Sequence, residues 1–105
     1  MKKMIDNISK ISDLYASRFG IERSSDWYLL KIQEEVGEMC SAYLKNTQRA
    51  RVAGQSSDEL KKNLEDEFAD VLAMLLLFAK DQEIDPESAI KNKWYQYLEV
   101  TKDLK

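Results

Sequence analysis

Hydrophobic positions recur at helical spacing along most of the chain. Four segments show this period, at about residues 4–18, 26–46, 57–82 and from 86 onward. The first should stop near Gly20, and the fourth is the best marked, with Asp85 as its cap and Pro86 at its first position. No stretch shows the sustained alternation of a strand. The pattern predicts an all-α fold of four to five helices.

The segment KNTQRARVAGQSSDEL joins the second and third predicted helices and is the one long polar connection. It carries Arg49 and Arg51, and we expect a loop or a frayed helix end. Ser56 and Glu59 have the spacing of a capping box, which predicts the start of the third helix there.

The composition is that of one globular domain spanning residues 1–105, with 44% hydrophobic and 33% charged residues. So small a domain has a limited core, which favours association with copies of itself. The net charge of −3 argues against nucleic acid as a partner, because domains that bind phosphate backbones usually carry a basic excess.

Three features predict a cytoplasmic protein without a membrane partner. Cys40 is the single cysteine, so no intrachain disulfide can form; it lies on the apolar side of its helix, where we expect a packed thiol. The first residues, MKKMIDNISKISDLY, lack the apolar stretch of a secretory signal. The longest apolar run, residues 71–79, is far shorter than the ~20 residues of a membrane span.

The chain contains no histidine. This excludes serine–histidine and cysteine–histidine catalysis and imidazole-ligated zinc. Any metal ion must be held by oxygen ligands, which suit hard cations such as Mg²⁺, Mn²⁺ or Ca²⁺.

The stretch KIQEEVGEM gathers Glu34, Glu35 and Glu38 on the second predicted helix. At about 100° per residue, five apolar residues form a stripe that should be buried. They are Ile32, Val36, Met39, Cys40 and Tyr43. Glu35 and Glu38 lie near the edge of this stripe, three residues apart, so their side chains can converge, whereas Glu34 points most nearly away.

The third predicted helix repeats the arrangement in LEDEFADVLAMLLLFA, where Glu67 and Asp70 are also three residues apart. Their face continues into Met74, Leu77 and Phe78, and the run VLAMLLLFA is apolar all round, which predicts burial on every side, in a core or a subunit interface. Charges at the start of such a stripe need a partner, because unpaired burial is costly. Four carboxylates without histidine point to a divalent cation.

The same residues have a plainer explanation. Glutamate-rich helix faces are common on acidic chains, and acids in the first turns of a helix suit its dipole. On spacing alone, a solvated acidic surface therefore stays open beside a metal site.

The motif Glu-Glu-x-x-Glu at 34–38, followed after 28 residues by Glu-x-x-Asp at 67–70, resembles the signature of the MazG-like all-α nucleoside triphosphate pyrophosphohydrolases. The surrounding EEVGEM and EDEFADVLAMLLLFAKDQEIDPESAIKNKW are also similar to that family, so the resemblance covers about residues 27–94.

The resemblance implies a MazG-like helical bundle, assembled as a homodimer or homotetramer with active sites near helices of more than one subunit. It implies Mg²⁺-dependent hydrolysis of a nucleoside triphosphate to the monophosphate and pyrophosphate, with Mn²⁺ as a possible replacement. The magnesium ligands would be Glu35, Glu38, Glu67 and Asp70. Glu34 would support these ligands without binding the metal ion itself, or would help to orient or deprotonate the attacking water.

The fourth predicted helix departs from the family pattern Asn-x-Lys-aromatic-x-x-Arg. Lys93 and Trp94 match the central pair, which implies a phosphate contact for Lys93, but Lys91 stands at the asparagine position and the arginine is missing. Lys31, Arg49 or Arg51 could substitute. Trp27, just before the acidic helix, is the candidate platform for a base, although a structural role is equally compatible with the sequence.

Two alternatives remain. One is a phosphoribosyl-ATP pyrophosphohydrolase-type relative, and the other is a non-enzymatic helical oligomer whose acid cluster is a relic or a partner-binding surface. The expected function is nucleoside triphosphate pyrophosphohydrolysis, with nucleotide-pool housekeeping as its role.

Overall fold

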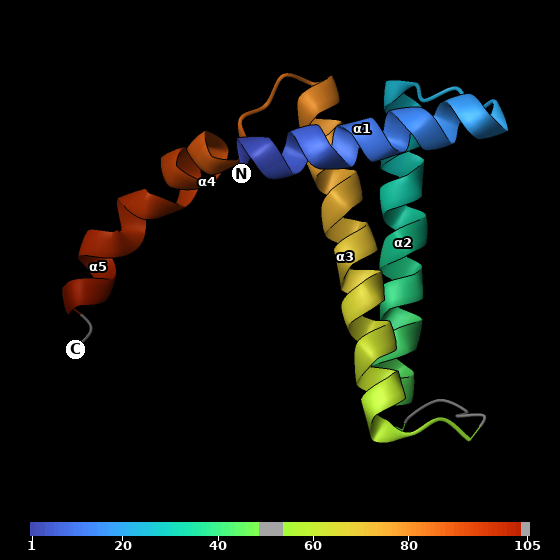
Figure 1. The fold of residues 1–105 in the computed structure, drawn as a ribbon. Helices are drawn as coiled ribbons and strands as arrows, with labels where there is room; N and C mark the ends of the chain where they lie inside the picture. The colour runs from blue at the N-terminus through green and yellow to red at the C-terminus, as the bar shows by residue number, and fades with distance from the viewer. Residues whose placement is uncertain (49–53, 104–105) are drawn as a thin grey trace.

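The computed structural model describes residues 1–48 and 54–103, and these are helical and contain no strand (Figure 1). The helices are α1 (Lys2–Phe19), α2 (Ser25–Asn46), α3 (Ser57–Asp81), α4 (Pro86–Trp94), the 3₁₀ helix η1 (Tyr95–Tyr97) and α5 (Leu98–Asp103). The predicted all-α fold is confirmed, with the fourth predicted segment divided into α4, η1 and α5.

Helix ends lie where the sequence places their signals. The side chains of Ser24, Ser56 and Asp85 accept hydrogen bonds from the backbone N–H three residues on, at 3.1, 3.2 and 3.1 Å. Each such cap contributes about 1 kcal/mol to its helix. After α1 the chain turns at Gly20, whose φ of 64° suits a residue without Cβ.

Helices α2 and α3 form an antiparallel hairpin, and α1 lies across it near the start of α2 and the end of α3 (Figure 1). The chain from α4 to α5 leads away from the hairpin beside the N-terminal end of α1. None of the helices in these residues has the length and hydropathy needed to cross a membrane.

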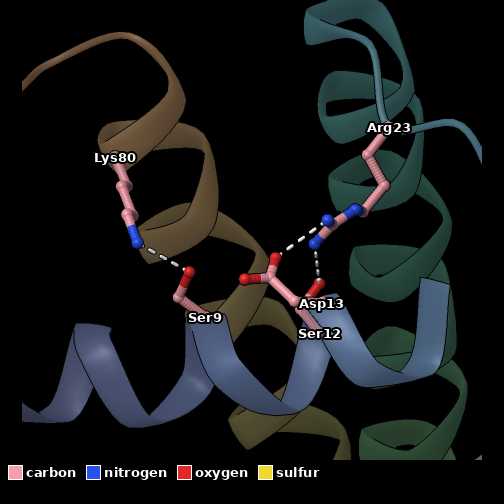
Figure 2. A network of polar contacts seen from close by, with 5 residues as sticks. All are labelled: Ser9, Ser12, Asp13, Arg23 and Lys80. Atoms are coloured by element: carbon pink, nitrogen blue, oxygen red, sulfur yellow. Dashed lines mark hydrogen bonds and ion pairs between the residues drawn. The ribbon is translucent and has the colours of Figure 1, made fainter. Parts of the chain in front are cut away.

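A polar network holds α1 on the hairpin (Figure 2). Lys80 of α3 donates a 2.7 Å hydrogen bond to the buried Ser9 of α1. Arg23, just before α2, donates to Ser12 and Asp13 of α1, at 2.8 Å each. Helix α1 is thereby tied to α3 and to the start of α2. These contacts fix how α1 crosses the hairpin.

Among the residues that the structure describes, the core is small and no large side chain is completely buried. Its apolar members are Ala16, Tyr28, Leu60, Val71, Leu76, Leu77 and Ala79. Most of them lie in α3, because α3 is the helix that contacts both α1 and α2. The apolar run of the third helix thus supplies the centre of the fold.

One burial prediction, that of the Cys40 stripe, is wrong for the single chain. Cys40 is exposed and not packed, and Val36 and Tyr43 of the same predicted stripe are 36% and 48% exposed. Leu72 and Leu75 of α3 are exposed, so the core of one chain covers only part of the apolar run, and burial of the rest in a subunit interface stays a prediction. The physical reason is that α2 and α3 pair through the neighbouring stripes that carry the acids.

The chain is also less compact than a single domain of its length. Its radius of gyration is 17.3 Å, whereas a folded domain of this length has about 13 Å. Its accessible surface is 8366 Å², whereas a monomer of 12.2 kDa is expected to expose about 6,100 Å². One chain alone therefore leaves much apolar surface uncovered.

Candidate active site

One stripe of α2 and one of α3, with positions at alternating spacings of three and four, line the cavities beside the acids and carry both polar and apolar residues. On α2 these positions hold Lys31, Glu35, Glu38, Ala42 and Lys45. On α3 they hold Leu60, Asn63, Glu67, Asp70, Met74 and Leu77. Residues at this spacing share one helix face, and the antiparallel pairing sets the acids of one helix opposite those of the other.

Three carboxylates converge between the helices. Glu35, Glu67 and Asp70 each present one oxygen, and these atoms all lie within 4.8 Å of one another. Glu35 and Glu67 are half-buried, and Asp70 is exposed. A group of three hard oxygen donors at this separation is chemically suited to Mg²⁺ or Mn²⁺.

The carboxylates of the cluster repel one another, and Glu35 and Glu67 are partly buried. Burial raises the pKa of Glu35 above its usual value, the charges of Asp70 and Glu67 raise it further, and Lys31 opposes them. Burial likewise raises the pKa of Glu67, with Glu38 and Asp70 as the next causes. A cation at the cluster would relieve the repulsion, so the residues fit the metal ion that the sequence predicts.

The raised pKa values predict an unusual pH dependence of stability without divalent metal. A carboxyl group with a higher pKa in the folded state binds protons more readily when folded, so the cluster should gain stability as the pH falls from 7 to about 5 and lose it as the pH rises again. The measurement is the melting temperature in chelator across this range. Hydrogen bonds from Ser25 and Gln82 lower the pKa of Asp81, so its contribution to stability is lost only as the pH falls below about 4, outside this range.

The double variant Glu35→Gln/Glu67→Gln isolates the contribution of the cluster. It should be the more stable protein at pH 7, and the difference from wild type should shrink toward pH 5. The double variant Glu22→Gln/Glu65→Gln, which changes the same charge at exposed positions, is the matched control. A difference that does not change with pH would contradict the prediction.

The other two glutamates of the motif lie beside the cluster. The charge of Glu38 acts on both Glu35 and Glu67, although its oxygens are not among the three that converge. Glu34 is exposed, and its carboxylate lies 3.3 Å from the Lys31 Nζ. The site therefore has three acids in contact range, a fourth close by, and Glu34 toward solvent.

A cavity of about 650 Å³ opens between α1, α2 and α3 next to Glu35 and Asp70. We call it the larger cavity. Its apolar wall includes Ile8, Ile11, Met74 and Leu77, and its polar lining includes Arg23 and Lys31. This volume lies within the range of about 300–1,000 Å³ typical of small-molecule sites.

The predicted base platform and the predicted basic residue both line the larger cavity. Trp27 is half-buried and meets Tyr28 edge to face at 5.2 Å. The Nζ of Lys31 lies 5.9 Å from the centre of the Trp27 ring. Trp27, Lys31 and Glu35 thus form one continuous edge along α2 from the cavity to the acids.

A second, smaller cavity of about 150 Å³ lies on the other side of the acids, and we call it the smaller cavity. Glu38 and Glu67 form its edge, and Ser41, Lys45 and Asn63 supply most of the remaining polar lining. The acids are therefore bordered by an apolar space toward α1 and a polar space toward the far end of the hairpin.

Lys93 is not brought to the acids by its own chain. It lies on α4, is exposed, and lines neither cavity. Arg49 and Arg51, the other candidates for phosphate contacts, lie outside the described residues. Within the described chain, the basic residues that line the two cavities are Arg23, Lys31 and Lys45.

The sequence did not indicate Arg23, Lys45 or Asn63. Arg23 lines the larger cavity, where Ser12 and Asp13 of α1 accept its hydrogen bonds. These contacts join residues eleven and ten positions apart, so no local pattern predicts them. The spacing of the acids could have indicated the other two. Lys45 lies two turns after Glu38 on the same face of α2, and Asn63 lies one turn before Glu67 on the same face of α3.

Comparison with known proteins identifies one family. The sequence profile described as the MazG nucleotide pyrophosphohydrolase domain matches residues 23–97, which includes α2, α3, α4 and all the acids of the site. Searches of curated proteins and of solved structures return no significant match.

Proposed function

The chain belongs to the MazG nucleotide pyrophosphohydrolase family, which is generally dependent on divalent metal ions, and from this premise we propose that it hydrolyses nucleoside or deoxynucleoside triphosphates to the monophosphate and pyrophosphate. One observation carries the proposal. Three carboxylates converge, and two of them, Glu35 and Asp70, line a cavity of about 650 Å³, a size that suits a nucleoside.

Glu35, Glu38, Glu67 and Asp70 would hold Mg²⁺, or Mn²⁺ in its place. When bound, the metal ion would neutralise phosphate charge and lower the pKa of water near it. The ligands come from two rigid, capped helices, which suits a reaction in which positioning contributes most of the catalysis.

The chain's own residues would then position substrate and water. Water attacks the α-phosphorus, the bond from that atom to the bridging oxygen breaks, and pyrophosphate leaves. Glu34 would orient this water or accept its proton, since a carboxylate near solvent can pass the proton on. Lys31 would contact the α-phosphate as a point charge, and Trp27 would stack on the base.

We further propose that the active form is a homodimer or homotetramer. The chain exposes about 2,300 Å² more than expected for a monomer of its mass. That excess matches what one partner contributes to a large obligate interface, about 1,000–2,500 Å².

The proposed interface is the face of the hairpin opposite the acids. Leu29, Val36 and Tyr43 of α2 recur at intervals of seven and are 46%, 36% and 48% exposed. Phe68, Leu72 and Leu75 form the equivalent stripe of α3. Both stripes lie on the same face because the helices are antiparallel, and two such faces pack as a four-helix bundle.

Assembly would also explain the position of the C-terminal helices. Ile90 and Trp94 of α4 are 53% and 68% exposed, so α4 has an apolar side that its own hairpin does not cover. Packing of α4 on a second copy would bring Lys93 toward that copy's phosphates. The corresponding cellular role is housekeeping of the nucleotide pool in the cytoplasm.

The test is pyrophosphate release from a panel of canonical and modified nucleotides in Mg²⁺, with phosphoribosyl-ATP included and Glu67→Gln as the inactive control. Turnover of nucleoside triphosphates that requires metal supports the proposal. Turnover of phosphoribosyl-ATP alone would identify the histidine-pathway type of relative. Absence of any metal-dependent turnover would favour the non-enzymatic alternative.

A further inference from the structure

We propose that the smaller cavity binds the pyrophosphate end of the substrate, with Lys45 as its cation and Ser41 and Asn63 as hydrogen-bonding groups. The inference rests on the proposed function and adds to it the direction of the substrate along the hairpin. The nucleoside would lie toward α1, and the β and γ phosphates would point toward the far end of α2.

The first argument is the division of the four acids between two unlike spaces. Glu35 and Asp70 border the larger cavity, whose lining is mostly apolar, whereas Glu38 and Glu67 border the smaller cavity, whose lining is mostly polar. A nucleoside triphosphate has two similarly unlike ends, an uncharged aromatic base at one end and charged phosphates at the other. The reverse orientation would place the phosphates against a mostly apolar wall whose two cations, Arg23 and Lys31, are already paired with Asp13 and Glu34.

The second argument is size. The smaller cavity has about 150 Å³, the share of about five waters in the liquid. That space suits a diphosphate group, but it is much smaller than a typical small-molecule site of about 300–1,000 Å³. The larger cavity is therefore the one with room for the nucleoside.

The third argument is the state of Lys45. Its side chain is half-buried on the last turn of α2, and it makes no hydrogen bond or ion pair with any other residue in the described ranges. Lys31, at the opposite end of the same stripe, is paired with Glu34 and lies beside Trp27. Lys45 is thus the uncommitted cation on the polar side of the acids, and a partly buried ammonium group favours an anionic ligand.

The experiment measures binding of inorganic pyrophosphate in Mg²⁺ by calorimetry, which requires no turnover. Lys45→Gln should weaken binding about tenfold, while Lys31→Gln should change it by less than about threefold. Lys61→Gln is the matched control, since Lys61 is exposed on α3 and lines neither cavity. Asn63→Asp, a nearly isosteric change at an exposed position, should also weaken binding about tenfold because it adds a negative charge.

Several results would overturn the inference. They are a wild type that does not bind pyrophosphate, equal losses in Lys31→Gln and Lys45→Gln, and a loss in Lys31→Gln alone, which would reverse the substrate. If Lys45→Gln does not fold, Asn63→Asp decides between the outcomes. Failure of the proposed function is seen separately, as absence of turnover of every nucleotide by a wild type that still binds pyrophosphate.

Discussion

Replacement of Glu67 by glutamine is expected to lower kcat by about 10³-fold and, without metal, to make the protein more stable. The loss of turnover follows because the carboxylate belongs to the group of three oxygens that would hold the ion. The gain in stability follows because glutamine removes a charge that burial disfavours and that Glu38 and Asp70 repel, which are the causes that raise the pKa of Glu67. Each like-charge pair costs about 0.2–0.5 kcal/mol, so a gain of up to about 1 kcal/mol is expected.

The stabilisation by magnesium should disappear in the same variant. A ligand that binds only the folded state at 100 times its Kd adds about 2.7 kcal/mol to stability, so wild type should melt at a higher temperature in Mg²⁺. Thermal denaturation with chelator and with Mg²⁺, beside steady-state turnover, measures all three effects. Glu65→Gln, an exposed acid two residues away, should change none of them. A destabilised Glu67→Gln protein would show that Glu67 has a structural role.

The helices were predictable from the sequence because their signals are local. The caps at Ser24, Ser56 and Asp85 and the turn at Gly20 each depend on residues within one turn of the helix end. The pairs Glu35–Glu38 and Glu67–Asp70 were recognisable for the same reason, since three-residue spacing fixes a common face. What spacing could not give is the approach of Glu35 to Glu67 and Asp70 across two helices.

The burial errors have a different cause. The predicted stripe with Val36, Cys40 and Tyr43 is apolar, so burial was the natural expectation, but the single chain places it on an outer face. Hydrophobicity indicates that a surface is to be covered and does not indicate which chain covers it. The larger cavity was missed because its α1 wall depends on the Arg23 and Lys80 contacts, which join residues far apart in sequence.

The substitution Leu72→Glu is expected to dissociate the proposed oligomer and lower its melting temperature by about 10 °C or more. In a monomer the change would be mild, because Leu72 is already 39% exposed. In an interface it would bury an unpaired carboxylate on each copy, at a cost of several kcal/mol, and 1 kcal/mol corresponds to about 4–8 °C for a domain of this size. Leu30→Glu is the matched control, since Leu30 is 65% exposed and belongs to neither apolar stripe. Sedimentation at micromolar concentration, with melting curves of both variants, makes the measurement. If wild type and Leu72→Glu sediment alike as monomers, the apolar face of the hairpin is not an interface between copies of this chain.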